Sequence, residues 1–199
     1  MENVMPSEKE TLEERIARVL KDKVEIVSYD PRWPGRFEEE KRFLLQTLPA
    51  DIIRRVEHFG STAVPGLEAK PVVDMLVEVR SLEETQRRIV PVLEALASYE
   101  YFWRPTGADS EPFYCWFIKR DTAGARTHHI HMVEPGFPQW EALLFRDHLI
   151  AHPETAREYG ELKRHLSKAY PDDRVAYTRE KTAFVTRVTT LASETRSAR

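Results

Sequence analysis

Three features of this 199-residue chain have residue types and spacing that could do chemistry: a glycine–serine turn, an aspartate in an apolar segment and a pair of histidines. Gly60 and Ser61 form the turn, which offers backbone N–H groups of the kind that hold a phosphate. Asp74 follows across a proline-bounded loop. A carboxylate among apolar residues is costly unless it is paired, bound to a metal or open to solvent. A phosphate turn followed by a carboxylate on a strand suits the handling of a nucleotide–metal complex.

The segment that carries Asp74 is predicted to be a strand over residues 72–79, with side chains that alternate between two faces. One face is wholly apolar and should meet a helical layer: Val73, Met75, Val77 and Val79. The other face carries Asp74 and Glu78, so we expect it to be partly open to solvent, with Asp74 toward a cleft. A divalent cation such as Mg²⁺ is one use for this carboxylate. An ion pair with a neighbouring arginine or histidine is an equally good one.

The histidines belong to another predicted strand. Ile130 and Met132 suit the core. His129 and His131 alternate with them and should therefore share the cleft face with Asp74. Imidazole is a plausible ligand for Zn, Mn or Fe and a poor one for Mg. We favour the simpler interpretation that these histidines hydrogen-bond the cleft wall or contact substrate without a metal.

Several cationic and hydroxyl side chains are candidates for phosphate binding, because arginine suits bidentate contact and lysine acts as a point charge. The candidates are Lys70, Arg126, Arg146 and Lys181, together with Ser61 and Thr62 beside Gly60 in the turn. Each of the cationic residues has a simpler alternative as a solvated surface residue. His58 precedes the turn and either faces the same cleft or buttresses the turn.

The remaining segments should position these residues in an α+β fold, because runs of strands followed by runs of helices favour that class. Strands are predicted over residues 23–29, 52–59, 72–79, 99–103, 113–119 and 127–134. Helices are predicted over residues 8–21, 34–48 and 82–98, and in three segments after residue 138. We therefore expect a mixed or antiparallel sheet of about five strands, with helices on one face and a C-terminal helical cap.

The chain should divide into an N-terminal helical arm over residues 1–22, a single domain over 23–192 and a frayed tail over 193–199. Ser7 and Glu10 have the spacing of a capping box at the start of the first helix. Pro91 either kinks the third predicted helix or starts a new one.

Composition excludes several classes of protein. No apolar run approaches the roughly 18 residues that a membrane span needs, and the acidic N-terminal sequence is not that of a signal peptide. Cys115 is the only cysteine, which excludes an internal disulfide and fits a reducing cytoplasm. The net charge of −3, without a dense basic block, disfavours nucleic-acid binding. We therefore expect a cytoplasmic protein with no membrane partner, whose oligomeric state is open.

Several segments together resemble the GrpB family. They are YDPRWPGRF, EHFGSTAVPGLEAKPVVDMLVEV, THHIHMVEPG, LLFRDHLIAHPE and YTREKTAFV, in the family's order. The resemblance implies the nucleotidyltransferase fold of the DNA polymerase β type, and family members also occur fused to dephospho-coenzyme A kinase. The superfamily pattern is Gly-Ser, a spacer, then Asp-apolar-Asp/Glu. Gly60, Ser61 and Asp74 match it, but Leu76 stands where the second carboxylate would be.

The resemblance implies a protein that binds a nucleoside triphosphate, or another phosphorylated small molecule, and transfers a nucleotidyl group to an acceptor that the sequence does not identify. Asp74 would hold Mg²⁺ or Mn²⁺, and His129 and His131 would complete the site by metal ligation, proton transfer or substrate contact. Lys70 and Arg126 would neutralise developing phosphate charge. Two alternatives remain open at this point: a catalytically degenerate module that binds a nucleotide or partner, and a metal-dependent phosphoesterase that uses the His-x-His strand.

Overall fold

The centre of the molecule is a five-stranded sheet in the order β1-β2-β5-β4-β3. The computed structural model describes residues 11–20, 23–105 and 113–197. The strands are β1 Ile53–Phe59, β2 Val73–Val79, β3 Tyr99–Pro105, β4 Phe113–Arg120 and β5 Arg126–Val133. β2 and β5 run parallel, and the other neighbouring pairs are antiparallel. The expected α+β class and five-stranded mixed sheet are confirmed.

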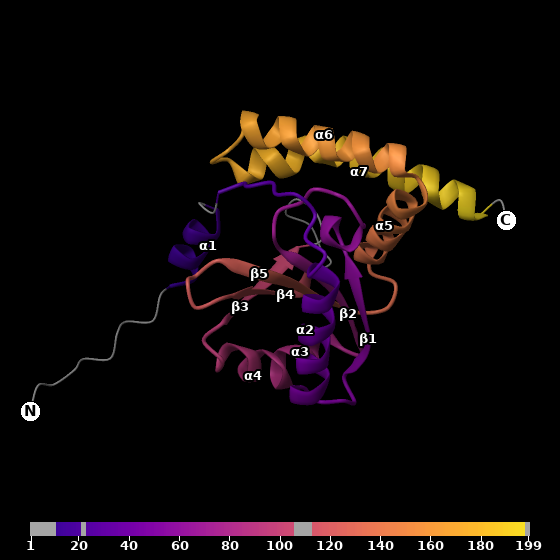
Figure 1. Ribbon diagram of the computed structural model, residues 1–199. Coiled ribbons are helices and arrows are strands. Elements are labelled where there is room, and N and C mark those ends of the chain that lie inside the picture. Colours follow the sequence, from indigo (N-terminus) through magenta and orange to yellow (C-terminus); the bar gives the residue numbers. More distant parts are fainter. Residues whose placement is uncertain (1–10, 21–22, 106–112, 198–199) are drawn as a thin grey trace, which may run out of the picture.

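Helices surround this sheet in groups (Figure 1). Those against one face are α2 Trp33–Thr47, α3 Leu82–Arg88 and α4 Val90–Glu94. After the last strand come the short 3₁₀ helix η2 Pro138–Glu141 and then α5 Ala142–Ala151, α6 Pro153–Ala169 and α7 Arg174–Ser197. α6 and α7 lie side by side across one end of the sheet, where β1 ends and β2 begins (Figure 1). These helices are the predicted C-terminal helical cap. None of the described helices is long and apolar enough to cross a membrane.

Alternation along β2 separates a packing face from a face that can hold a ligand. Its apolar residues are at most 1% exposed: Val73, Met75, Val77 and Val79. Asp74 and Glu78, on the other face, are only partly buried. Leu76, which lies between these two carboxylates, is 0% exposed, so the middle of this face is closed. The face is therefore open at the two ends of the strand, and Asp74 lies at the end nearer the C-terminal cap.

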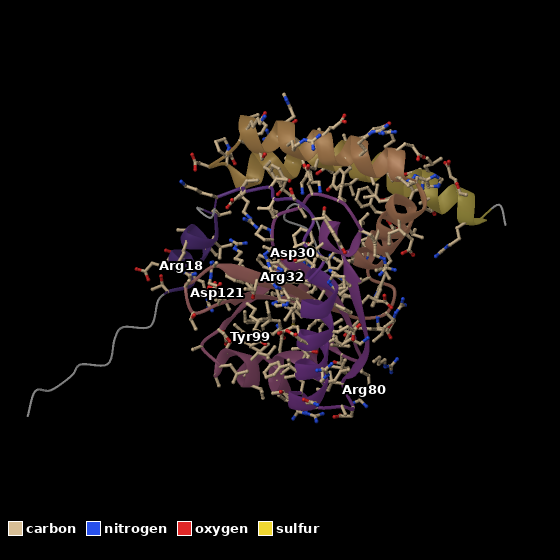
Figure 2. All side chains as sticks on the ribbon, in the orientation of Figure 1. Arg18, Asp30, Arg32, Arg80, Tyr99 and Asp121 are labelled. Carbon is tan, nitrogen blue, oxygen red and sulfur yellow. The ribbon has the colours of Figure 1, made fainter. Side chains whose placement is uncertain are left out.

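A buried carboxylate fixes α2 to the sheet. The Glu40 side chain is only 3% exposed. It accepts a hydrogen bond from the Tyr99 hydroxyl at 2.6 Å and forms an ion pair with Lys119 (Figure 2, where Tyr99 is labelled). The helix begins after a turn in which Asp30 accepts hydrogen bonds from the backbone and side chain of Arg32 at 2.9 Å. The turn thus fixes the start of α2 locally, and Glu40 adds a polar contact with the sheet to the apolar face of the helix.

The prediction of a strand over residues 23–29 is wrong. Only Val27 takes a sheet-like position, as an isolated bridge to Ala69. The segment instead runs beside the C-terminal helices, where the Val24 amide donates to the Pro171 carbonyl at 3.1 Å and the Val24 side chain packs on Tyr177. Its β-branched residues serve this packing against helices, a use that a local strand pattern does not distinguish from pairing.

Three smaller expectations concern helix ends. The capping box predicted at Ser7 lies outside the described residues. Thr11 and Glu14 form a capping box instead. The Glu14 amide donates to Thr11 Oγ1 at 3.2 Å, and the Thr11 amide donates to Glu14 Oε2 at 2.8 Å. Pro91 belongs to the first turn of the separate helix α4, so the second of its two alternatives holds. Helix α7 continues to Ser197, through residues that we expected to fray.

Candidate functional site

Asp74 lies at the start of β2, where the register places His129 of β5 on one side and Phe59 of β1 on the other. Its side chain is 28% exposed, so the carboxylate remains accessible to a ligand. Gly60 packs directly against it: the residue has φ +71°, and a Cβ there would lie 2.5 Å from Asp74 Oδ2. Glycine is therefore required at this point of the turn, for its backbone angle and for the close approach.

A line of hydrogen bonds connects Asp74 to helix α1 Leu12–Leu20. His129 Nδ1 lies 3.0 Å from Asp74 Oδ1, and His129 Nε2 lies 3.4 Å from Arg126 Nη1. The other terminal nitrogen of Arg126 donates to the backbone carbonyl of Val19. Because a guanidinium can only donate, His129 Nε2 is the acceptor and Nδ1 carries the proton that bonds Asp74. A neutral imidazole thus lies between a carboxylate and a guanidinium.

The pKa values agree with this assignment. Burial lowers the pKa of His129 to about 4, against the opposing effect of Asp74, so the ring is neutral at pH 7. Burial would raise the pKa of Asp74, but the His129 hydrogen bond, together with the charge interactions of His129, His131 and, last, Lys70, outweighs it and brings that pKa down to about 2. Asp74 is therefore ionised at every pH at which the protein would work.

His131 shares this face two residues further along β5, as the alternation predicted. Its ring lies 5.2 Å from that of Phe59 and 5.5 Å from that of Tyr114, and its Nδ1 is 3.1 Å from the Tyr114 hydroxyl. Asp74, His129 and His131 each offer a ligand atom within 4.8 Å of the others, and no other group of three does so in the part of the chain that the structure describes. The two predicted histidines and the predicted carboxylate are thus brought together.

These residues suit a metal that arrives with a phosphate better than a metal held by protein alone. Both ring nitrogens of His129 already face partners, Asp74 and Arg126. Leu76 occupies the place of a second carboxylate and is 0% exposed. Asp74 is therefore the one carboxylate of this group of three, and Mg²⁺ is often bound by one carboxylate together with substrate phosphates.

His58 and the hydroxyls of the turn support the loop that carries Gly60. The His58 ring stacks on Phe37 of α2 at 4.8 Å, and its Nε2 is 3.0 Å from Thr62 Oγ1. Burial lowers the pKa of His58 to about 4. Ser61 is a hydrogen-bond partner of Tyr159 from α6. His58 was expected either to face the cleft or to buttress the turn, and its contacts are those of a buttress. Ser61, through Tyr159, is the turn hydroxyl nearer the C-terminal cap.

Lysines from the cap and the adjoining loop surround Asp74 with positive charge. Lys70 Nζ and Lys181 Nζ lie 5.4 Å and 4.7 Å from the centre of the same Tyr177 ring. Burial lowers the pKa of Lys181 to about 8, with Asp74 opposing the shift. Burial, reinforced by neighbouring cations that include Lys181, lowers the pKa of Lys70 well below its usual value. Neither lysine has an acidic side chain within ion-pair distance among the described residues.

Lys163 was not among the phosphate-binding candidates from the sequence. Lys163 of α6 is 2% exposed, donates to the Glu68 carbonyl and lies 4.7 Å from the centre of the Tyr159 ring. Burial lowers its pKa to about 7. The spacing of Lys163 one turn after Tyr159, on the apolar side of a predicted helix, was a signal that could have identified it. Arg146 does not reach this group: it donates to the His58 carbonyl at 2.7 Å and supports β1.

The sequence profile of the GrpB protein family matches residues 23–190. The chain belongs to the GrpB family. The Bacillus subtilis protein YqkA is 39% identical over 166 residues, which is 83% of this chain and 46% of that protein. The glutamate-rich protein GrpB of Alkalihalophilus pseudofirmus is 36% identical over 168 residues, or 84% of this chain and 94% of that one. The crystal structure of GrpB from Enterococcus faecalis matches with a TM-score of 0.74 and 33% identity, covering 86% of this chain and 99% of that chain.

A more distant match connects this GrpB-family chain with an enzyme. A dephospho-CoA kinase of Mycolicibacterium paratuberculosis is 29% identical over 180 residues, covering 80% of this chain and 44% of that protein. This GrpB-family chain thus spans less than half of both YqkA and the kinase. The activities of those longer proteins are therefore not assigned to this chain.

Proposed function

We propose that this GrpB-family protein binds a nucleoside triphosphate at Asp74 and transfers its nucleotidyl group to an acceptor. The observation that supports it is the excess of positive charge around one ionised carboxylate. Lys70 and Lys181 lack an acidic partner among the described residues and converge on Asp74. A triphosphate would supply the missing negative charge, and lysines suit phosphate as point charges.

In this proposal the nucleotide enters as its Mg²⁺ or Mn²⁺ complex, with Asp74 as the protein ligand and the turn at Gly60, Ser61 and Thr62 against the phosphates. The metal would lower the charge repulsion between the phosphates and an incoming nucleophile. His129 holds the Asp74 carboxylate in place through its Nδ1 proton. Its Nε2 faces Arg126, so His129 is a positioning residue and a poor proton acceptor.

Transfer would proceed by attack of an acceptor oxygen on the α-phosphorus. The new P–O bond forms as the bond between the α-phosphorus and the bridging oxygen breaks, and pyrophosphate leaves with that oxygen. His131, on the same face, takes up the acceptor proton. Lys70 and Lys181 neutralise the charge that develops on the departing pyrophosphate. The match to a kinase is in keeping with nucleotide chemistry, since a kinase takes a phosphoryl group from a nucleotide.

A second candidate function is a nucleotide-binding module without turnover. Leu76 favours it, because this buried leucine leaves a single carboxylate where nucleotidyltransferases usually hold two metals between two or three carboxylates. Both candidates use the same cationic surroundings of Asp74 and differ only in whether pyrophosphate is released.

Thermal stabilisation by each nucleoside triphosphate, with and without Mg²⁺ or Mn²⁺, tests both candidates. Wild type should be stabilised by nucleotide with metal, and Asp74→Ala should lose most of that shift. Asp51→Ala is the matched control, because Asp51 pairs with Arg88 away from the site. Pyrophosphate release on adding phosphorylated acceptors separates transfer from binding alone. No stabilisation by any nucleotide would remove both candidates.

A further inference from the structure

Arg126, the first residue of β5, has no step of its own in the proposed transfer, although its side chain is buried. A buried guanidinium is costly unless its hydrogen bonds are satisfied, so its contacts indicate its role. One terminal nitrogen, Nη1, lies 3.4 Å from His129 Nε2. The other, Nη2, donates to the backbone carbonyl of Val19 in α1, 107 residues earlier in the chain. Arg126 thus connects the Asp74 site with α1.

The Val19 carbonyl belongs to the last turn of α1, which ends at Leu20. The last four carbonyls of a helix have no partner within the helix and form the negative end of its dipole. An arginine that donates there satisfies one of these carbonyls and places its charge where the dipole favours it. The contact therefore stabilises both partners: it completes the end of α1, and it holds the guanidinium in one position.

Helix α1 depends on contacts with the rest of the molecule. It has nine residues, and isolated helices shorter than about 12 residues are marginal in water. Arg15 pairs with Glu94 of α4 at 3.2 Å, and Val19 packs its side chain in the main core. Arg18 pairs with Glu100 of β3 at 2.9 Å. The last turn of α1, with the carbonyl that Arg126 contacts, is therefore formed only when α1 is docked.

The same guanidinium fixes the imidazole that bonds Asp74. The buried His129 ring has a partner at each nitrogen: Arg126 at Nε2, and Asp74 Oδ1 at 3.0 Å from Nδ1. Bonds at both nitrogens fix the ring in its plane, whereas a single bond leaves the ring able to turn about it. Partners that orient a metal ligand without touching the metal typically change metal affinity by about 10–100-fold. Arg126 is thus placed to set the orientation of Asp74 through His129.

We propose that Arg126 is a positioning residue for Asp74, acting through His129, and that the last turn of α1 holds Arg126 in place. The orientation of the carboxylate then depends on the docking of α1. Its consequence for a nucleotide rests on the proposed transfer, whereas the coupling of α1 to His129 does not. The match to the GrpB profile begins at residue 23, so the coupling involves a helix outside that match.

The Nδ1 proton of His129 gives a readout that needs no nucleotide. Because this proton is buried and bonded to Asp74, it should exchange slowly with water and give a resolved ¹H–¹⁵N signal in the wild-type chain. Arg126→Met removes both donors and keeps an apolar stem of similar length, so the signal should broaden or disappear. A direct contact of Arg126 with phosphate, the role expected from the sequence, would leave the signal unchanged.

The dependence on α1 is tested without altering the site. Arg15→Glu/Arg18→Glu sets two carboxylates against Glu94 and Glu100 and should weaken the His129 signal as Arg126→Met does. Arg15→Lys/Arg18→Lys keeps both charges and should retain the signal. Ile16→Glu is the matched control for an added carboxylate on the same helix, because Ile16 is 42% exposed, and should also behave as wild type. Circular dichroism verifies folding, and the surface variants carry the test if Arg126→Met does not fold.

Titration of ATP with Mg²⁺ into the same variants separates this proposal from the proposed function. Affinity should fall about tenfold in Arg126→Met and in the charge-reversed α1 variant. A wild-type signal in either variant, or no protected Nδ1 proton in wild type, would overturn the coupling. A loss of ATP affinity with an unchanged signal would assign Arg126 to direct phosphate contact and overturn it as well. Loss of the signal in a chain that binds no ATP would keep the coupling and remove the nucleotide site.

Discussion

Two adjacent histidines on β5 face opposite sides of the sheet and belong to opposite kinds of polar site. His128 lies on the side of α2, near Glu40, Lys119 and Tyr99. His129 lies on the other side with Asp74. Each side thus contains one buried or half-buried carboxylate and one buried histidine, made by the same strand one residue apart.

The difference lies in the balance of charge. Glu40 is matched by the ammonium of Lys119 and by the Tyr99 hydroxyl, so the α2 side is closed and close to neutral. Asp74 is outnumbered by lysines from the loop before β2 and from α7, so its side is positively charged and partly open. A polar cluster whose charges balance one another is typical of a structural role. A cluster with excess positive charge is a candidate site for an anionic ligand.

Removal of the Glu40 carboxylate should give the largest effect, because the α2 side depends on internal pairing. Glu40→Ala leaves Lys119 and the Tyr99 hydroxyl without their partner and should lower the free energy of unfolding by about 3 kcal/mol. Urea denaturation at pH 7 measures it. Glu38→Ala on the same helix is the control, since Glu38 is 59% exposed and lies 3.9 Å from Lys41; it should cost below about 0.5 kcal/mol. A Glu40→Ala protein as stable as wild type would mean that the network contributes nothing.

The close approach of Gly60 to Asp74 gives a smaller effect, and it concerns the other side of the sheet. Gly60→Ala forces a side chain into a positive-φ position and against Asp74 Oδ2, and should cost about 2 kcal/mol. It should also abolish nucleotide stabilisation, because the carboxylate must move. Gly35→Ala is a control of opposite sign: Gly35 lies in α2 with open space around it, and alanine there should stabilise by up to about 1 kcal/mol. Equal melting temperatures for the two variants would contradict the packing described here.

Strand alternation was enough to predict the centre of the site. It placed His129 and His131 on the face of Asp74 and left that carboxylate partly open, because a period of two is local and apolar residues mark the buried face. The class of fold followed from the order of elements in the same way. The pairing of β2 with β5, which sets Asp74 beside His129, also needed the register, and no local pattern contains it.

What the sequence did not predict depends on contacts between distant segments. Arg126 was expected to bind phosphate, and its guanidinium donates to the Val19 carbonyl of a helix more than 100 residues earlier. The segment over residues 23–29 was predicted to be a strand, but it packs on the cap through Val24. Arg174 lies close enough to Lys70 and Lys181 to lower their pKa values, and Lys163 lies near Lys181, because α6 and α7 fold back over the end of the sheet. Long-range packing of this kind overrides local propensity.

The smallest effect comes from Lys181 and has the opposite sign to that of Glu40. The pKa of Lys181 is about 8 in the folded chain and 10.5 in the absence of such surroundings. The unfolded chain therefore binds more protons between these pH values, and wild-type stability contains a penalty below pH 8 that disappears as the pH rises to 10.5. Lys181→Met removes the penalty, so the variant should be more stable than wild type by about 1 kcal/mol at pH 7, after allowance for solvent screening.

The advantage of Lys181→Met should shrink steadily between pH 8 and 10.5, as urea denaturation at several pH values would measure. Lys168→Met, at an exposed position of the neighbouring helix α6, is the control and should show no such trend. The same variant pair should separate in nucleotide affinity, which falls only for Lys181→Met. If Lys181→Met were less stable than wild type at pH 7, the ammonium would already have a favourable partner. The two sides of the sheet would then be alike in charge balance, and the argument for a ligand at Asp74 would lose its main support.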